Sequence, residues 1–206
     1  MNNSSRGKLA WTSYPPYALS CPPFGRSSQT AVAGGADLTV LLERYLKASN
    51  RHDLKTLRAM TAEDAVWKLG SDLLAGRDEV LRPNTCDAGA NTRLNWSNLV
   101  AHGNTIEFEL LERNDVLRAL GIPELRRFVR FTFEDGLVKR KEETKPAVGI
   151  EALHAKGALF LTWLRRTHPD ALGQIMTSEG KFMYSRESCR IEAKLAAEWA
   201  RHHEAR

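Results

Sequence analysis

Residues 104–115, NTIEFELLERND, have the pattern of one long β-strand. Side chains alternate between the two faces of a strand, which places Ile106, Phe108 and Leu110 together on one face. The other face is mostly charged and carries Glu107, Glu109, Leu111, Arg113 and Asp115. Arg113 and Asp115 end the strand on the same side, with one residue between them. We therefore expect them to form either an ordinary ion pair or the polar centre of a pocket.

The neighbouring stretches predict an antiparallel meander around this strand. Apolar residues recur at strand spacing within residues 93–102, 125–133 and 137–145. Gly103 and Gly136 lie in short polar turns, where their tolerance of positive φ suits a hairpin. Before the meander, we predict helices over residues 37–49 and from 53 to about 60, a strand over 65–69, a short helix after Gly76 and a loop over 83–91. After Pro146 the pattern becomes helical and ends in a helix over residues 185–203.

Length and composition indicate a soluble globular protein. A chain of 206 residues with 42% hydrophobic and 27% charged residues can bury a sizeable core. No apolar run approaches the ~20 residues of a membrane span, so we expect no membrane contact. The net charge of +5 does not come from residues 37–145, which carry 18 basic and 18 acidic residues. A nucleic-acid-binding domain concentrates basic charge on its folded core, so we expect no nucleic-acid partner.

The cysteines and histidines give no sign of a metal or cofactor site. Cys21, Cys86 and Cys189 are scattered without ligand spacing, and we expect reduced thiols in a cytoplasmic protein. No pair of histidines has metal spacing, so neither a metal nor a cofactor is predicted. Residues 1–36 are rich in Ser, Pro and Gly and lack the apolar core of a signal peptide, which predicts a disordered tail.

A series of short segments between residues 37 and 145 matches a known family in order and spacing. They are Tyr45-Leu46, Asn50-Arg51-His52-Asp53-Leu54, Asp64-Ala65-Val66-Trp67, Gly76-Arg77-Asp78, Gly103-Asn104-Thr105, Glu112-Arg113-Asn114-Asp115 and Phe133-Glu134-Asp135-Gly136. In these segments the chain resembles the nuclear transport factor 2-like superfamily, particularly its SnoaL-like members. The resemblance implies an α+β fold, with a cone-shaped curved antiparallel sheet packed on N-terminal helices around a pocket for a small lipophilic molecule, often in a homodimer. We expect a disordered tail over 1–36, a SnoaL-like domain over 37–146 and a helical extension over 147–206.

The end of the organising strand resembles limonene epoxide hydrolase within that superfamily. Its catalytic Arg-x-Asp followed by Val-Leu-Arg-Ala-Leu is similar to residues 113–120 here, and its second aspartate corresponds to Glu143. The resemblance implies that Asp115 is the general acid, Arg113 the bridging cation and Glu143 the base. It further implies a substrate pocket lined by Tyr45, Trp67, Leu69, Leu111 and Val129. Ketosteroid isomerase chemistry is not expected, because Leu69 and Val129 occupy the positions of its two acids.

Each of these assignments has a plain structural alternative. Arg113 and Asp115 can be an ion pair that steadies the strand end, and Glu143 can belong to a solvated edge strand. Tyr45, Trp67 and Leu69 can be core residues. The leading prediction is a cofactor-independent hydrolase or isomerase, epoxide hydrolase-like, that acts on a small lipophilic metabolite. The alternative is a non-catalytic ligand-binding or dimeric interaction module of the same fold.

Overall fold

The computed structural model describes residues 35–69 and 72–204, with side chains described over 37–68 and 73–203. The predicted tail therefore lies outside the described residues, except that the first helix begins at Gly35. The elements in chain order are α1 (Gly35–Asn50), α2 (Leu54–Ala59), β1 (Thr61–Leu69), β2 (Asp72–Ala75), α3 (Arg77–Gly89), β3 (Arg93–His102), β4 (Thr105–Arg113), α4 (Asp115–Ala119), β5 (Leu125–Glu134), β6 (Leu137–Val148), α5 (Ile150–Thr167), α6 (Pro169–Ile175) and α7 (Arg186–Glu204).

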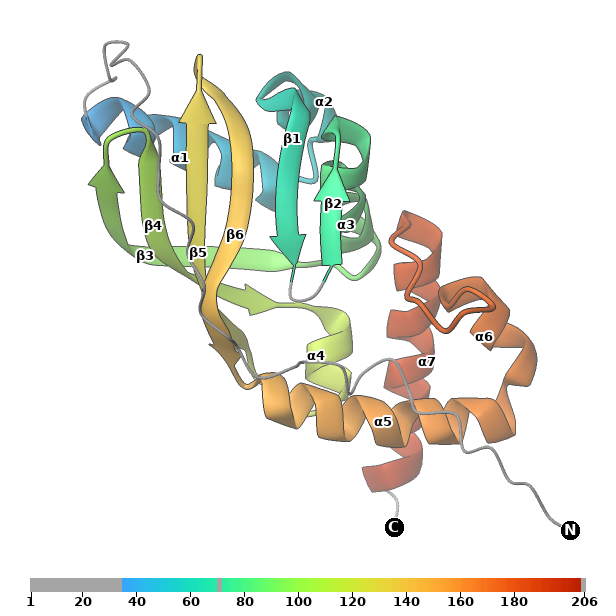
Figure 1. Cartoon of the computed structure of the whole chain (residues 1–206). Helices are drawn as coiled ribbons and strands as arrows, with labels where there is room; N and C mark the ends of the chain where they lie inside the picture. Colours follow the sequence, from blue (N-terminus) through green and yellow to red (C-terminus); the bar gives the residue numbers. More distant parts are fainter. Residues whose placement is uncertain (1–34, 70–71, 205–206) are drawn as a thin grey trace, which may run out of the picture.

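The strands form one sheet in the order β2-β1-β6-β5-β4-β3. Neighbouring strands are antiparallel except β1 and β6, which pair in parallel. Helices α1, α2 and α3 cover one face of the sheet, and the long strands bend beyond them (Figure 1). The predicted α+β class with a curved sheet packed on N-terminal helices is confirmed. β6 occupies a central position, between β1 and β5.

The main core lies between α1 and the covered face of the sheet. Ile106 and Phe108 on β4 are 0% and 3% exposed and pack with Leu42 and Leu46 of α1. Burial of each such side chain contributes roughly 1.5–3 kcal/mol. The predicted division of β4 into an apolar face and a charged face is therefore confirmed. We call the covered face of the sheet its inner face.

Two local predictions were wrong in the stretch before β3. The expected loop over residues 83–91 is the second half of α3, which continues through Pro83 to Gly89. Proline removes one helical hydrogen bond, but the packing of this helix against α7 outweighs the loss. The short edge strand β2 was also missed.

The C-terminal extension forms a second core with α4. Phe160, Leu164 and Trp199 are buried there against Leu117 and Leu120. Within the part of the chain that the structure describes, no helix is long and apolar enough to cross a membrane.

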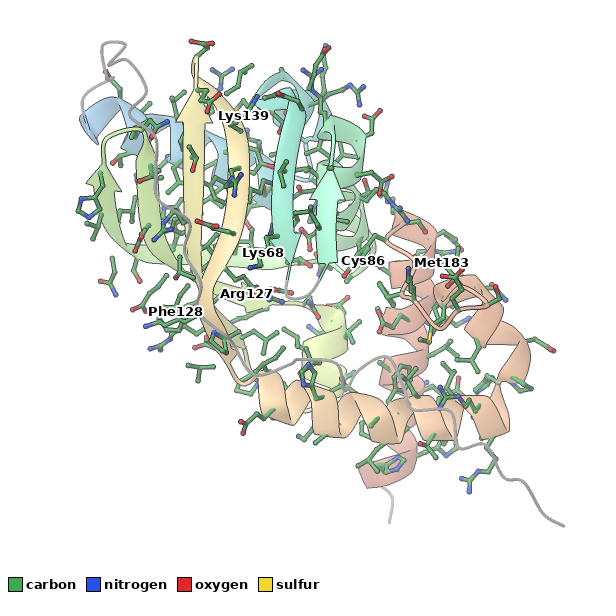
Figure 2. The ribbon with its side chains drawn as sticks, in the orientation of Figure 1. Lys68, Cys86, Arg127, Phe128, Lys139 and Met183 are labelled. Atoms are coloured by element: carbon green, nitrogen blue, oxygen red, sulfur yellow. A yellow bond between two sulfur atoms is a disulfide. The ribbon has the colours of Figure 1, made fainter. Side chains whose placement is uncertain are left out.

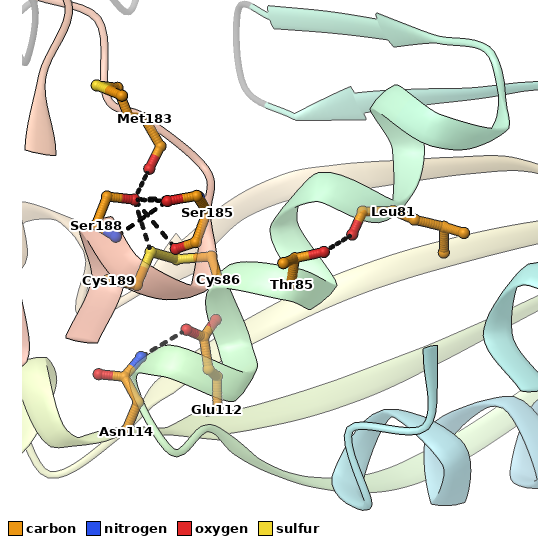
Figure 3. Close-up of a disulfide and its surroundings, with 9 residues drawn as sticks. All are labelled: Leu81, Thr85, Cys86, Glu112, Asn114, Met183, Ser185, Ser188 and Cys189. Carbon is orange, nitrogen blue, oxygen red and sulfur yellow. Dashed lines mark hydrogen bonds between the residues drawn. A yellow bond between two sulfur atoms is a disulfide. The ribbon is translucent and has the colours of Figure 1, made fainter. Parts of the chain in front are cut away.

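A disulfide ties this extension to the sheet domain. Cys86 on α3 and Cys189 on α7 are bonded, with Cα atoms 5.3 Å apart (Figure 3). The expectation of reduced thiols was therefore wrong for these two residues, because residues 103 positions apart meet only in the fold. Disulfides persist mainly in oxidising compartments, so the bond counts against the predicted cytoplasmic location.

Candidate functional site

The structure separates the predicted acid and cation from the predicted base. Arg113 is 58% exposed on the outer face of the sheet and donates from Nη2 to Glu124 Oε2 at 2.7 Å. Asp115 begins α4 and pairs with Arg118 one turn later, at 3.0 Å. Neither residue contacts Glu143 through a described ion pair or hydrogen bond. Both residues thus have ordinary surface ion-pair partners.

Glu143 instead belongs to a three-residue group on the inner face. Arg127 on β5 donates from Nε to Glu112 Oε2 at 2.7 Å and from Nη1 to Glu143 Oε1 at 2.5 Å. The side chains of Arg127, Glu112 and Glu143 are 20%, 16% and 14% exposed, so they are largely desolvated. Glu112 lies on β4 and Glu143 on β6, so the central strand β5 carries the cation and its two neighbours carry the acids. Arg127 is labelled in Figure 2.

The strand pattern explains why these charges face inward. Glu112 follows Ile106, Phe108 and Leu110 at even spacing, and Arg127 precedes Val129 in the same way. The outer face carries a similar group, which we call the outer trio: Glu107, Arg130 and Glu142. Arg130 pairs with Glu107 at 2.5 Å and with Glu142 at 2.9 Å, and it is more exposed than Arg127. The sheet therefore carries a carboxylate–guanidinium–carboxylate group on each face.

Asp87 on α3 adds a carboxyl group to the inner group. Burial, followed by the Glu112 carboxylate, raises the pKa of Asp87 to about 7. Asn84 lies one helical turn earlier, is buried, and its Oδ1 has no hydrogen-bond partner among the described residues. A buried acceptor without a partner is costly unless a water or ligand satisfies it.

Lys141 on β6 is 2% exposed. Its Nζ donates to Tyr45 Oη and lies 4.5 Å from the Tyr45 ring centroid, 4.8 Å from that of Trp67 and 5.5 Å from that of Phe131. Burial lowers the pKa of Lys141 to about 7, with a smaller opposing effect of Asp87. We call Asp87, Glu112, Arg127, Lys141 and Glu143 the inner cluster.

The predicted substrate-lining residues divide between the two faces. Tyr45, Trp67 and Val129 lie with Lys141 or in the core beside it. Leu111 has the parity of Glu109 and Arg113, so it lies on the outer face. The backbone of Leu69 ends β1, but its side chain lies outside the described residues.

Burial opposes the charge of Arg127, yet the carboxylates of Glu112 and Glu143 raise its pKa above the usual value. Each of these carboxylates uses one oxygen for Arg127. The other oxygen of Glu112 accepts a hydrogen bond from Asn114 at 3.0 Å, whereas Glu143 Oε2 accepts none from a described residue. Chemically, the inner cluster combines a carboxyl group that is largely protonated below about pH 7 with a carboxylate held by a cation.

A second polar group lies at a small cavity in the extension. The cavity, of about 30 Å³, is lined mostly by apolar residues of α4, α5 and α6, with Glu192 of α7 at its wall. Burial raises the pKa of Glu192 to about 7. The volume suits about one water molecule. Among the described side chains, no group of three His, Cys, Asp or Glu residues could hold a metal ion.

No family model and no curated protein matches this chain. Solved structures that are similar to it include a protein from Kribbella flavida described as a ketosteroid isomerase, with 24% identity over 52% of this chain and 76% of that chain and a TM-score of 0.46. IdmH from Streptomyces antibioticus, described as a polyketide cyclase, has 17% identity over 59% of this chain and 98% of that chain, with a TM-score of 0.47. An LEH-like epoxide hydrolase from M. tuberculosis has 17% identity over 52% and 81%, with a TM-score of 0.43. Such values do not fix an activity, so the chemistry rests on this chain's own side chains.

Sequence reasoning missed four members of the inner cluster and found only Glu143. Every second residue of a strand lies on the same face, so counting from Ile106 would have placed Glu112 on the inner face. Counting back from Phe131 in the same way would have placed Arg127 there. Asp87 was hidden in the expected loop. Lys141 was hidden in a charged run that resembles an exposed edge strand.

Proposed function

We propose that the inner cluster performs cofactor-independent acid–base chemistry on a small lipophilic molecule, with hydration of an epoxide as the most concrete case. The observation that carries the proposal is the Glu112–Arg127–Glu143 bridge next to a carboxyl group of raised pKa. Opening an epoxide requires an acid for the ring oxygen and a base for the attacking water. Groups whose environments separate their pKa values are suited to these two roles.

The roles follow from the contacts of each side chain. Asp87 is the acid, since burial and Glu112 keep it protonated to about pH 7. Glu143 is the base, because its second oxygen is available and Arg127 stabilises its charge. Glu112 holds the other side of the guanidinium and helps to keep the proton on Asp87. This assignment keeps the predicted base and replaces Asp115 and Arg113 with Asp87 and Arg127.

Turnover of a panel of lipophilic epoxides in oxygen-18 water tests the proposal. The chain offers matched controls: Asp115→Asn for Asp87→Asn, and Glu142→Gln on the outer face for Glu143→Gln. We expect labelled diol from the unchanged protein and from both controls. In Asp87→Asn and Glu143→Gln, the turnover rate should be lower than that of the unchanged protein by ~100-fold or more. Turnover with unchanged protein should fall as the pH rises above about 7, where Asp87 loses its proton.

Two outcomes would overturn the proposal. Loss of turnover in Asp115→Asn but not in Asp87→Asn would return the site to the strand end. Absence of diol with every epoxide, from protein shown to be folded by circular dichroism, would favour the alternative of a non-catalytic ligand-binding module. Sedimentation in the same buffer would test the expected homodimer.

A further inference from the structure

Lys141 differs from the other buried cation of the inner cluster in its partners. Arg127 bridges two carboxylates, whereas no described carboxylate forms an ion pair with Lys141. The polar contact of Nζ is the Tyr45 hydroxyl, and three aromatic rings surround the rest. Burying an ammonium ion without a directly paired carboxylate is costly, and the smaller effect of Asp87 does not offset that cost, so this position favours the neutral amine.

A neutral, desolvated lysine is a nucleophile toward carbonyl carbon. We infer that Lys141 forms an imine with a small apolar aldehyde or ketone admitted to the inner face of the sheet. Burial lowers the pKa of Lys141 to about 7, which agrees with this role because neutral amine is then present near neutral pH. The inference goes beyond the acid–base proposal and does not depend on it, since an imine can form whether or not an epoxide is opened.

The reaction needs no oxidant or reductant. The Nζ lone pair attacks the carbonyl carbon, and the C=O π electrons move to oxygen to give a carbinolamine. In the carbinolamine one Nζ hydrogen has moved to this oxygen. The C–O bond then breaks as the oxygen takes a second proton from Tyr45 Oη and leaves as water, the remaining Nζ proton passes to Tyr45 Oη, and a C=N bond remains. Tyr45 Oη already contacts Nζ and can donate a proton to the departing oxygen. Burial raises the pKa of Tyr45, which keeps that proton in place.

The side chains around Lys141 indicate which ligand it would accept. The rings of Tyr45, Trp67 and Phe131 select an apolar body next to the carbonyl carbon. Glu143 lies two residues further along β6 on the same face, about 7 Å away by strand geometry.

Reductive trapping tests the inference on the full chain. The protein is incubated near neutral pH with butanal, benzaldehyde or cyclohexanone and cyanoborohydride, and each lysine is followed by peptide mass mapping. Lys139 is the internal reference, since it lies on the same strand, is 30% exposed and pairs with the exposed carboxylates of Asp64 and Glu134. We expect Lys141 to be alkylated at least ~10-fold faster than Lys139 by one or more of the compounds. In urea the two rates should become similar.

Variants separate a nucleophile from a structural lysine. Lys141→Met keeps an apolar stem but removes the amine, so it should remove the fast adduct, whereas Lys139→Arg should leave it unchanged. Tyr45→Phe should slow the adduct at Lys141 without changing labelling at Lys139. Alkylation of Lys141 no faster than that of Lys139 in the folded, unchanged protein, when both are labelled in urea, would overturn the inference. That result is read by mass and leaves the epoxide experiment unaffected.

Discussion

Removing the Cys86–Cys189 disulfide should strongly destabilise the protein. The change is the double variant Cys86→Ser/Cys189→Ser in a Cys21→Ser background, which avoids disulfide exchange with the third cysteine. The bond spans 103 residues. The chain-entropy relation gives about 4.7 kcal/mol for a loop of about 100 residues. With a urea slope of about 2.5 kcal/mol per molar, the unfolding midpoint should fall by about 2 M.

Equilibrium urea unfolding, followed by tryptophan fluorescence, measures this midpoint. Thiol titration of the Cys21→Ser protein comes first and should find no free thiol before reduction and two after it. Chemical reduction of that protein should reproduce the midpoint of the double variant. A midpoint shift below about 0.5 M would refute the reasoning, because it would mean that the bond restricts the unfolded chain very little.

Three further variants test the burial of Lys141 and the packing of α3 against α7. Above about pH 7 the unfolded chain binds a proton at Lys141 that the native protein lacks. The free energy of unfolding of the unchanged protein should therefore rise with pH, by up to ~1.4 kcal/mol per pH unit toward pH 10. Replacing Lys141 with Met should remove this rise. Equal slopes in urea titrations of both proteins at pH 7, 8 and 9 would contradict the burial of a neutral amine. Gly89→Ala should lower the free energy of unfolding by ~1–3 kcal/mol, since its new Cβ would lie 2.1 Å from Arg186 O across the α3–α7 contact. Gly173→Ala is the control: it lies in helix α6, its new Cβ would meet nothing within 4 Å, and its free energy of unfolding should rise by ~1 kcal/mol. Equal thermal unfolding midpoints for the two alanine variants would show that α3 and α7 are loosely packed.

The strands could be predicted from the sequence because their signal is local. Alternation within residues 104–115 is enough to assign Ile106 and Phe108 to the core and Glu107 to the outer face. The hairpin turns at Gly103 and Gly136 follow from the same kind of evidence, and both glycines have positive φ. Local pattern and turn chemistry therefore determined most of the meander.

The candidate site could not be assembled this way, because its members meet only through tertiary structure. Lys141 lies in the run Lys139–Glu143, which is typical of an exposed strand, but the order of strands places β6 between β1 and β5. Asp87 follows Pro83, a residue that usually ends a helix, and the helix persists because α3 packs on α7. The local sequence pattern predicts neither the order of the strands in the sheet nor the contact between α3 and α7.

The outer trio has a practical consequence for measurements on the inner face. Glu107, Arg130 and Glu142 repeat the chemistry of the inner bridge on the same three strands, but with greater exposure. At physiological ionic strength, charges interact over a screening length of about 8 Å, and exposed pairs are screened far more than desolvated ones. Added salt should therefore weaken the outer trio and leave Glu112, Arg127 and Glu143 almost unchanged. The outer trio thus serves as a reference for the inner bridge. Both groups pair one arginine with two glutamates, so a difference in their salt sensitivity reports how burial changes the strength of the ion pairs.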